Sequence, residues 1–163
     1  MHAYRRRFNQ FSCADIMSRD LVTVDFGTLL EDAWLLLRQH RIKALPVVDR
    51  VRRVIGIITL VDFMKHANLD IYDGFQIKLR RFLRRSTKSH SDKPEVVGQI
   101  MTSPVRTAAI DMHIVELVPL LSDAGLHHIP IVDAERRLAG MVTQSDLVAA
   151  LYRGKLADAA LVE

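Results

Sequence analysis

An internal repeat constrains the fold of this chain more than any other feature of its sequence. A constant shift of 84 residues places residues 16–63 on residues 100–147 without a gap. Self-similarity at a fixed offset indicates that one supersecondary unit occurs twice. A unit of about 50 residues buries too little apolar surface to be stable alone. We therefore expect two copies, related by a pseudo-twofold axis, that share one core and form two related clefts. The identical pairs include Ile16/Ile100, Met17/Met101, Thr23/Thr107, Pro46/Pro130, Val48/Val132, Asp49/Asp133, Gly56/Gly140, Thr59/Thr143 and Asp62/Asp146.

The hydrophobic pattern of each copy predicts the order β-α-β-β-α, and hence a mixed α/β (α+β) fold. A short extended piece at residues 22–24 or 106–108 precedes an amphipathic helix. Pro119 lies within the second of these helices and should kink or shorten it. The position of Trp34 on the apolar face favours core packing over stacking on a planar ligand. The apolar faces consist of Leu30, Ala33, Trp34 and Leu37, and of Ile114, Leu117, Val118 and Leu121.

Two strands and a second helix complete each copy. The strands are rich in β-branched residues, and they are separated by polar connections of hairpin length. The last helix starts near Asp62 or Asp146. Its apolar residues are Phe63, Met64 and Ala67, or Leu147, Val148 and Leu151. The predicted strands are 45–48 and 54–58 in the first copy, and 129–132 and 138–142 in the second.

The composition excludes several classes of protein. Of the 163 residues, 49% are hydrophobic and 26% are charged, which is typical of a chain that forms a globular core. The single cysteine, Cys13, excludes an internal disulfide framework and suits a reducing compartment. No apolar run approaches the roughly 18–20 residues needed to span a bilayer, and no apolar stretch of a signal peptide follows Arg5–Arg7. We therefore expect a soluble, cytoplasmic chain.

A Thr-x-x-Asp tetrapeptide closes each copy, at Thr59–Asp62 and at Thr143–Asp146. It matches a helix capping box with Asp in place of the usual Glu or Gln. An ionised Asp at this place can also accept hydrogen bonds from the two hydroxyls of a ribose. Both roles can coexist, because a helix N-terminus attracts anions. The middle residues Leu-Val become Gln-Ser in the second copy while Thr and Asp persist; taken together with the family resemblance described next, this favours the ligand role.

Together, the two copies resemble a tandem pair of CBS domains, or Bateman module. The resemblance rests on Ile-Met at the start, Pro-[Val/Ile]-Val-Asp in the middle and Gly-[Ile/Met]-[Ile/Val]-Thr-x-x-Asp at the end of each copy. It covers residues 12–68 and 96–153. A basic segment at 1–11, an inserted helix with a linker at 69–95 and a tail at 154–163 lie outside it.

The resemblance implies a regulatory module rather than an enzyme. Such modules bind AMP, ADP, ATP or S-adenosylmethionine in clefts between the repeats, change conformation in response, and usually form homodimers. Asp62 and Asp146 would hold the ribose hydroxyls, and Thr59 and Thr143 would face the phosphates. No other cofactor and no metal is expected. The remaining residues expected around the base and phosphates are Thr23, Lys43, Ala44, Leu45, Pro46, Thr107, His127, His128, Ile129 and Pro130.

A narrower resemblance concerns residues 90–102 and the later Gly-Leu-His-His-Ile-Pro-Ile-Val-Asp stretch. These residues resemble the soluble tail of HPP-family membrane proteins, in which a membrane-embedded region precedes the CBS pair. The resemblance implies such a partner region, absent from this chain, with Arg5–Arg7 near the cytoplasmic face of the membrane.

The segment between the copies contains a basic amphipathic stretch at residues 75–88. Its apolar residues recur at helical spacing, and no acidic residue occurs from Gly74 to Ser91. It can pack on the module, rest on an anionic membrane or bind nucleic acid; we favour packing and expect no nucleic-acid partner. Two alternatives to nucleotide sensing therefore stay open: a structural dimerisation domain with empty clefts, and a surface binder that acts through this segment.

Overall fold

The computed structural model describes the backbone of residues 10–66 and 94–159 and the side chains up to Arg153. The chain divides into two compact units. We call residues 22–105 the first-repeat unit, and residues 1–21 together with 106–163 the second-repeat unit. The basic stretch predicted at 75–88 and the N-terminal Arg5–Arg7 lie outside the described residues.

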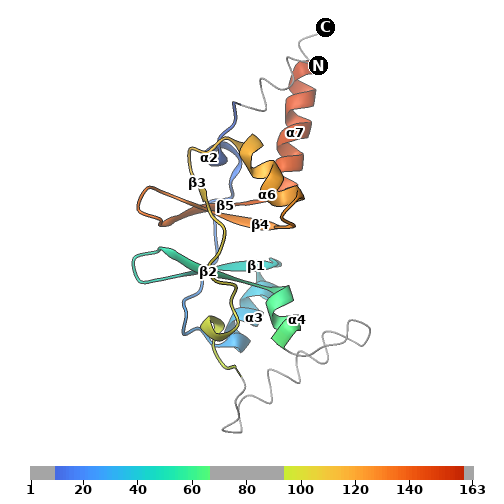
Figure 1. Ribbon diagram of the computed structural model, residues 1–163. Coiled ribbons are helices and arrows are strands. Elements are labelled where there is room, and N and C mark those ends of the chain that lie inside the picture. Colours follow the sequence, from blue (N-terminus) through green and yellow to red (C-terminus); the bar gives the residue numbers. More distant parts are fainter. Residues whose placement is uncertain (1–9, 67–93, 160–163) are drawn as a thin grey trace. The chain divides into compact units, whose positions relative to one another are not determined.

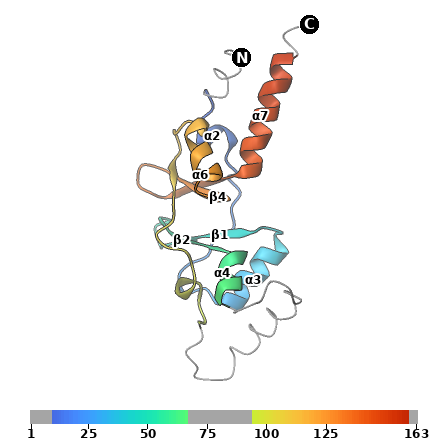
Figure 2. The ribbon, with the colours of Figure 1, turned by 45° about the vertical axis from the view of Figure 1, so that its right-hand side comes forward.

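The first-repeat unit is built on an antiparallel hairpin of β1 (Ala44–Val48) and β2 (Val54–Thr59), with Ala44 opposite Thr59. Helices α3 (Leu30–Gln39) and α4 (Leu60–His66) lie on the same face of this hairpin (Figures 1 and 2). Val24 pairs in parallel with Val47 of β1. A 3₁₀ turn, η1 (Val97–Gln99), completes the unit.

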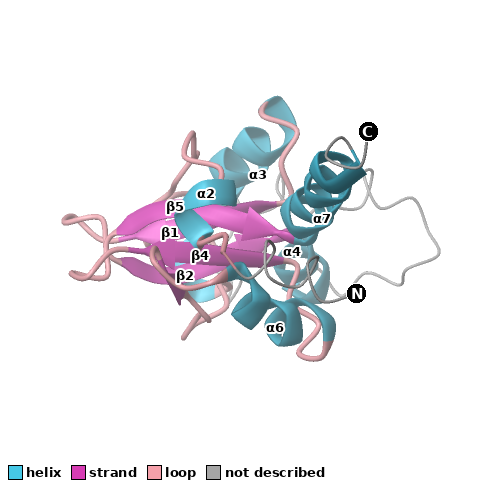
Figure 3. Cartoon of the chain, turned by 90° about the horizontal axis from the view of Figure 1, so that it is seen from above, coloured by secondary structure: helices cyan, strands magenta, loops and turns pink. Residues whose placement is uncertain are grey.

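The second-repeat unit repeats this arrangement with a three-stranded sheet, in the order β3 (Ala108–Ala109), β4 (His128–Val132) and β5 (Leu138–Thr143). Strands β4 and β5 form an antiparallel hairpin, and β3 runs parallel to β4. The strands are magenta and the helices cyan in Figure 3. The helical elements are α2 (Cys13–Ile16), η2 (Ile114–Leu117), α6 (Val118–Ser122) and α7 (Gln144–Ala159).

The predicted mixed fold is confirmed, and so is the order β-α-β-β-α in the second-repeat unit; in the first-repeat unit the leading strand is reduced to the isolated bridge between Val24 and Val47. The predicted strands differ from the observed ones by a single residue at one end. All four hairpin strands are one residue longer than predicted, because Ala44 pairs with Thr59 and His128 pairs with Thr143.

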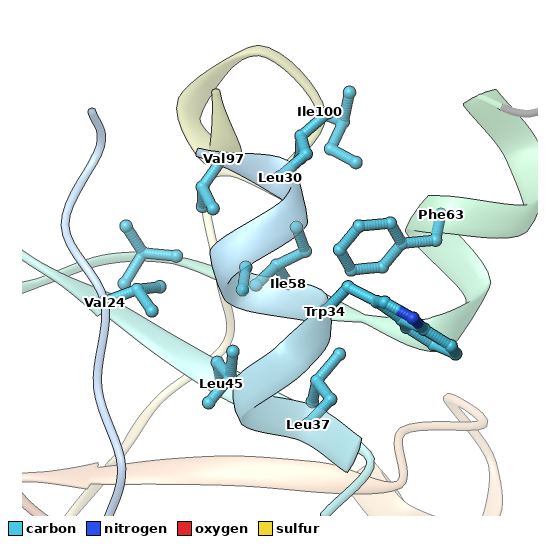
Figure 4. Close-up of a cluster of buried hydrophobic side chains, with 11 residues drawn as sticks. Val24, Leu30, Trp34, Leu37, Leu45, Ile58, Phe63, Val97 and Ile100 are labelled. Atoms are coloured by element: carbon cyan, nitrogen blue, oxygen red, sulfur yellow. The ribbon is translucent and has the colours of Figure 1, made fainter. Parts of the chain in front are cut away.

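The core of the first-repeat unit contains the predicted face of α3. Leu30, Ala33, Trp34 and Leu37 are all buried, together with Leu45 and Ile58 from the hairpin (Figure 4). The ring of Trp34 meets that of Phe63 edge to face, with centroids 5.9 Å apart and planes inclined at 61°. The prediction that Trp34 belongs to the core is confirmed, and Phe63 fixes α4 against α3.

The helix before β4 departs from the prediction at Val118, which is 39% exposed. Pro119 divides this helix into the 3₁₀ turn η2 and the short α6, and it lies in the first turn of α6, where no N–H is required. A 3₁₀ turn has three residues per turn, so Ile114 and Leu117 share a face and Val118 is rotated away from it. The expected kink at Pro119 is confirmed, and the assignment of Val118 to the core was wrong.

The apolar residues predicted for the last helix are not all buried. Val148 of α7 is 49% exposed and Leu151 is partly buried, whereas Leu147 and Ala150 are buried. The buried face therefore follows the spacing i, i+3 from Leu147, which leaves Val148 outside it. In the first-repeat unit Met64 is partly buried, and Ala67 lies outside the described residues.

Each unit contains the opening segment of the other repeat. Thr102, near the start of the second repeat, exchanges two backbone hydrogen bonds of 3.1 and 2.9 Å with Ile57 of β2. Ser18, near the start of the first repeat, does the same with Met141 of β5 at 2.9 and 3.0 Å. The buried residues accordingly form two clusters, one per unit. The sequence predicted a core shared by the two repeats. Within each unit, this sharing takes the form of an exchanged segment: the opening segment of one repeat, which contains Ser18 or Thr102, packs in the unit that is built on the other repeat.

The exchange explains why glycine recurs in the closing motif. A Cβ atom on Gly56 would lie 2.6 Å from the sulfur of Met101 and 3.0 Å from the carbonyl oxygen of Thr102. A Cβ on Gly140 would collide with Met17 and lie 2.9 Å from the carbonyl oxygen of Ser18. Met101 and Gly56, 45 residues apart in sequence within the first-repeat unit, are thus two sides of one contact.

Candidate functional site

The two Thr-x-x-Asp motifs lie where the second hairpin strand of each unit turns into a helix. Thr59 is the last residue of β2 and Leu60 the first of α4. Thr143 and Gln144 occupy the same places between β5 and α7. We call Thr59–Asp62 the first corner and Thr143–Asp146 the second corner.

At the first corner both carboxylate oxygens of Asp62 are engaged. Its Oδ2 accepts the main-chain N–H of Thr59 at 2.8 Å and the Thr59 hydroxyl at 3.0 Å. Its Oδ1 accepts the hydroxyl of Thr102 at 3.0 Å. Asp62 is only 6% exposed, and these three donors compensate the burial of its charge.

At the second corner the same bonds form on one side only. Oδ2 of Asp146 accepts the N–H of Thr143 at 2.7 Å and its hydroxyl at 2.9 Å. The N–H of Asp146 in turn donates to the Thr143 hydroxyl oxygen at 3.3 Å, which completes a reciprocal cap. Within the part of the chain that the structure describes, no group donates to Oδ1 of Asp146.

The capping interpretation of both motifs is confirmed by these bonds, but capping alone does not identify a ligand site. Ser12 and Asp15 form the same pair of bonds at the start of α2, at 2.7 and 3.0 Å, and no ligand role is expected there. What distinguishes the two corners from α2 is their place at the end of the second hairpin strand of each unit. Each corner offers a carboxylate in a fixed position, which can accept hydrogen bonds from ligand hydroxyls at any oxygen that is not already bonded.

The residues before the central proline lie beside each corner, because the hairpin register brings them there. Ala44 is directly opposite Thr59, and His128 is directly opposite Thr143. The N–H of Leu60 also donates to the carbonyl oxygen of Lys43 at 3.4 Å. In each unit, the predicted site residues before the central proline are thus adjacent to the Thr-x-x-Asp motif of the same unit.

The predicted residues differ in what they can offer. The Lys43 and His127 side chains are exposed and can meet an anion, whereas His128 is partly buried. Thr23 and Thr107 are partly buried at the start of the extended pieces; Val24, which follows Thr23, donates its N–H to the carbonyl of Pro46 at 3.1 Å. The side chains buried in the strands are Ala44, Leu45, Pro46, Ile129 and Pro130, so these residues can offer a ligand little beyond their main-chain groups.

Sequence reasoning missed one residue at the first corner, Thr102. The signal was present, because Met101-Thr102 aligns with Met17-Ser18, and both side chains carry a hydroxyl. Its significance was hidden because Thr102 is 40 residues from Asp62.

Two other features bear on the chemistry. Burial raises the pKa of the Cys13 thiol to about 11, so this cysteine is protonated and unreactive at neutral pH. Among residues 10–66 and 94–159, no cluster of three or more His, Cys, Asp or Glu side chains is placed to hold a metal ion. In the same part of the chain, no helix combines the length and apolarity needed to cross a membrane.

The comparisons with known proteins define the family. The family model of the CBS domain matches residues 13–68 and 97–153, so this chain belongs to the CBS-domain family and contains the domain twice. The uncharacterized protein MJ1426 of Methanocaldococcus jannaschii is 28% identical over 153 residues, covering 84% of this chain and 89% of that protein. The inosine-5'-monophosphate dehydrogenase of the same organism is 28% identical over 134 residues, 82% of this chain. This chain spans only 22% of that enzyme, so the similarity concerns a minor part of it.

Solved structures share the fold. The CBS domain pair of protein MJ0100, in complex with 5'-methylthioadenosine and S-adenosyl-L-methionine, has a TM-score of 0.64 at 26% identity, covering 89% of this chain and 98% of that one. The CBS domain of a CBS-domain-containing membrane protein from Sphaerobacter thermophilus has a TM-score of 0.69 at 27% identity, with coverages of 91% and 93%. CBSX2 in complex with AMP has a TM-score of 0.70 at 24% identity, with coverages of 89% and 98%. The similarity to CBSX2 establishes the fold alone.

Proposed function

We propose that this chain is a regulatory module that binds an adenosine-containing ligand at its Thr-x-x-Asp corners. The observation that carries the proposal is the carboxylate of Asp146, which is fixed by two donors on Oδ2 while Oδ1 stays available. A ribose presents vicinal hydroxyls, and an ionised carboxylate is the acceptor that such donors prefer. The MJ0100 pair, whose ligands carry an adenosine moiety, supports this class of ligand.

The ligand class comprises AMP, ADP, ATP and S-adenosylmethionine. Exposed Lys43 and His127, next to the corners, would receive phosphate groups by charge-assisted hydrogen bonds. Binding would regulate by population shift, since a ligand stabilises whichever arrangement of the two units it binds more tightly. The chain itself would catalyse no reaction.

A thermal-shift screen tests this function. Each of the four ligands at millimolar concentration is expected to raise the melting temperature by mass action if it binds. The double variant Asp62→Ala/Asp146→Ala should abolish the shift. Asp15→Ala is the matched control, because it removes the same type of cap at α2 and should lower stability while preserving the ligand response. No shift with any of the four ligands would refute nucleotide sensing.

Homodimerisation is a second proposal, favoured by apolar side chains on the outer faces of the helices. Leu35 of α3 is 53% exposed and Val61 of α4 is 47% exposed, and Val148 of α7 is comparably exposed. Apolar side chains on several helices of one small chain are typical of a surface that a second copy covers. Leu35→Glu with Val148→Glu should convert a dimer to a monomer in light scattering. Val51→Glu, at a hairpin tip, should leave the dimer intact.

The membrane context remains a proposal. Similarity to the CBS domain of the Sphaerobacter thermophilus membrane protein agrees with the resemblance to HPP tails. Reading the gene for codons that encode an upstream membrane region tests it. Binding of the chain to anionic liposomes, and its loss on neutralising Arg81, Arg84 and Arg85, tests the alternative role of residues 75–88.

A further inference from the structure

The carboxylates of the two corners differ in the bonding of a single oxygen atom. Oδ2 of each aspartate is bonded in the same way, with distances that agree within about 0.1 Å between the corners. Oδ1 of Asp62 is bonded to Thr102, whereas Oδ1 of Asp146 has no donor among the described residues. Repeat symmetry would make the two sites equivalent, so this atom is where their functions can diverge.

Thr102 is held rigidly in front of Asp62. Its N–H and carbonyl both bond to Ile57, and the next residue, Ser103, donates its hydroxyl to the carbonyl of Ile55 at 2.9 Å. A threonine side chain is also stiff, because two heavy atoms on Cβ restrict its rotamers. The hydroxyl of Thr102 therefore already donates to Oδ1 of Asp62, the acceptor atom that a ribose hydroxyl would need. A ligand would have to break this part-buried bond before making its own, with no net gain in hydrogen bonds.

Ser18 is the counterpart of Thr102 in the second-repeat unit, and it leaves Asp146 open. It makes the same two backbone bonds, to Met141, but its hydroxyl does not donate to Asp146. No buried side-chain polar atom lacks a partner among the described residues, so the unbonded Oδ1 of Asp146 reaches solvent. Water can be displaced from that oxygen by a ligand hydroxyl.

We propose that the chain binds one adenosine ligand, with its ribose on Asp146, and that Thr102 closes the corner of Asp62 to ribose. The inference rests on the proposed function and assigns its two corners different roles. Asp62 becomes a structural carboxylate that links β2, α4 and the exchanged segment. Thr102 and Ser18 become the residues that decide which corner is open.

Isothermal titration of the full chain with AMP and with S-adenosylmethionine tests this assignment. We expect one ligand per chain for whichever compound binds. Asp146→Asn should weaken binding at least tenfold, which corresponds to losing a hydrogen bond to a charged acceptor. Asp62→Asn should change the dissociation constant by less than about threefold, although it should lower the melting temperature. Because Asp62→Asn also disturbs the cap bonds, Thr102→Val supplies a milder second variant; it leaves Asp146 untouched, so the dissociation constant of the Asp146 site should again change by less than about threefold.

The sharpest variant is Ser18→Thr. The backbone pairing that positions Thr102 should place the new hydroxyl against Oδ1 of Asp146, and binding should weaken about tenfold without loss of stability. Two ligands per wild-type chain, or binding lost with Asp62→Asn and retained with Asp146→Asn, would overturn the assignment while leaving nucleotide binding in place. A wild-type chain that binds neither compound would overturn the proposed function itself, and the assignment with it.

Discussion

At the scale of single residues, three arginines adopt a left-handed backbone conformation that L-residues avoid. Arg41 has φ of 54°, and Arg52 and Arg136 at the hairpin tips have φ of 65° and 64°. Arg41 ends α3 in a Schellman arrangement, in which the N–H of Ile42 donates to the carbonyl of Leu37 at 3.0 Å. The position that matches Arg41 in the second repeat is Gly125, with φ of 66°. The strain is thus present in one repeat and relieved in the other.

Replacing Arg41 by glycine should stabilise the protein. The left-handed conformation costs an L-residue roughly 1–2 kcal/mol, and glycine avoids this cost. Glycine also has greater conformational entropy in the unfolded chain, which offsets part of the stabilisation. We therefore expect the free energy of unfolding to rise by about 0.5–1 kcal/mol. Urea denaturation measures the change. Arg38→Gly, inside the last turn of α3, is the control and should destabilise by about 1 kcal/mol. Equal losses for both variants would contradict the role assigned to the φ of Arg41.

The hairpin aspartates should make stability depend on pH. The main-chain N–H of Arg137, which donates to Asp133 at 2.8 Å, lowers the pKa of this carboxyl below its ordinary value of 3.8; partial burial opposes the shift, and the Arg137 charge adds to it. A lowered pKa means that the folded state prefers the ionised form. The stabilisation is therefore complete above about pH 4 and is lost as the pH falls further.

Asp133→Asn tests this dependence. The free energy of unfolding, measured by denaturant titration at several pH values from 6 to 3, should fall less steeply with acid in the variant than in the wild type. Asp20→Asn, at an exposed aspartate outside the hairpins, is the control that removes one carboxylate without touching the bonds to Asp133. If the free energy of unfolding fell equally steeply with acid in the wild type and in Asp133→Asn, the hairpin bonds would not be what lowers the pKa of Asp133.

At the scale of elements, the contact between a methionine and a glycine joins the exchanged segment to the second hairpin strand. Met17 lies across Gly140, and Met101 lies across Gly56. The same crossing positions Thr102 against Asp62, since Thr102 follows Met101 directly. A change at the glycine should therefore disturb both the packing and the cap of the following helix.

Gly140→Ala should destabilise the protein by about 1–3 kcal/mol, because the new methyl group overlaps Met17 and a backbone oxygen that cannot move away freely. Combining it with Met17→Ala should cost less than the sum of the two single changes, since the smaller side chain makes room. Chemical denaturation of the four proteins in this cycle measures the coupling. Gly27→Ala is the control: its nearest contact would be 3.6 Å, and it should change stability little. Strict additivity would exclude the contact as the cause.

At the scale of the whole molecule, a structural unit is not a contiguous repeat. The first-repeat unit, residues 22–105, needs Val97 and Ile100 from beyond its own repeat to complete its core. The segment 12–68 lacks both residues, although it contains every element that the repeat pattern defines. Fold boundaries and repeat boundaries thus differ by the length of one exchanged segment.

Fragments should reveal this difference. A fragment of residues 22–105 should unfold cooperatively on heating, because its hairpin, helices and exchanged segment are all present. A fragment of residues 12–68 should show no cooperative transition, because its core is open where Val97 and Ile100 belong. Circular dichroism during thermal melting measures both. Cooperative melting of the shorter fragment alone would contradict the division into units.

Much of this architecture is predictable from sequence, and the limits have physical causes. The spacing of Leu30, Trp34 and Leu37 predicts α3, and the β-branched runs predict the hairpins, because these signals are local. The exchange is not predictable from the repeat, since Met17-Ser18 and Met101-Thr102 align with each other and an alignment cannot tell which copy each one packs against. Val118 was misassigned because the helical period does not account for a 3₁₀ turn before Pro119.

The candidate site shows the same limits. Thr59, Asp62, Thr143 and Asp146 follow from the motif, and hairpin register brings the residues before the central proline beside them. The difference between the corners depends on Thr102, which reaches Asp62 only through the exchange. A long-range contact of this kind leaves no periodic signal in the chain.

The exchanged segments also set the order in which the chain can assemble during synthesis. The first-repeat unit is contiguous, so it is complete as soon as residue 105 has left the ribosome. The second-repeat unit joins Cys13 and Ser18 to Met112 and Met141, and the latter two residues are translated only after residue 105. The N-terminal segment must therefore wait, unpaired, while most of the chain is translated, and closing so long a loop is slow. Early pairing of this segment with a neighbouring chain would yield a swapped dimer, which makes translation speed and chain concentration determinants of the product.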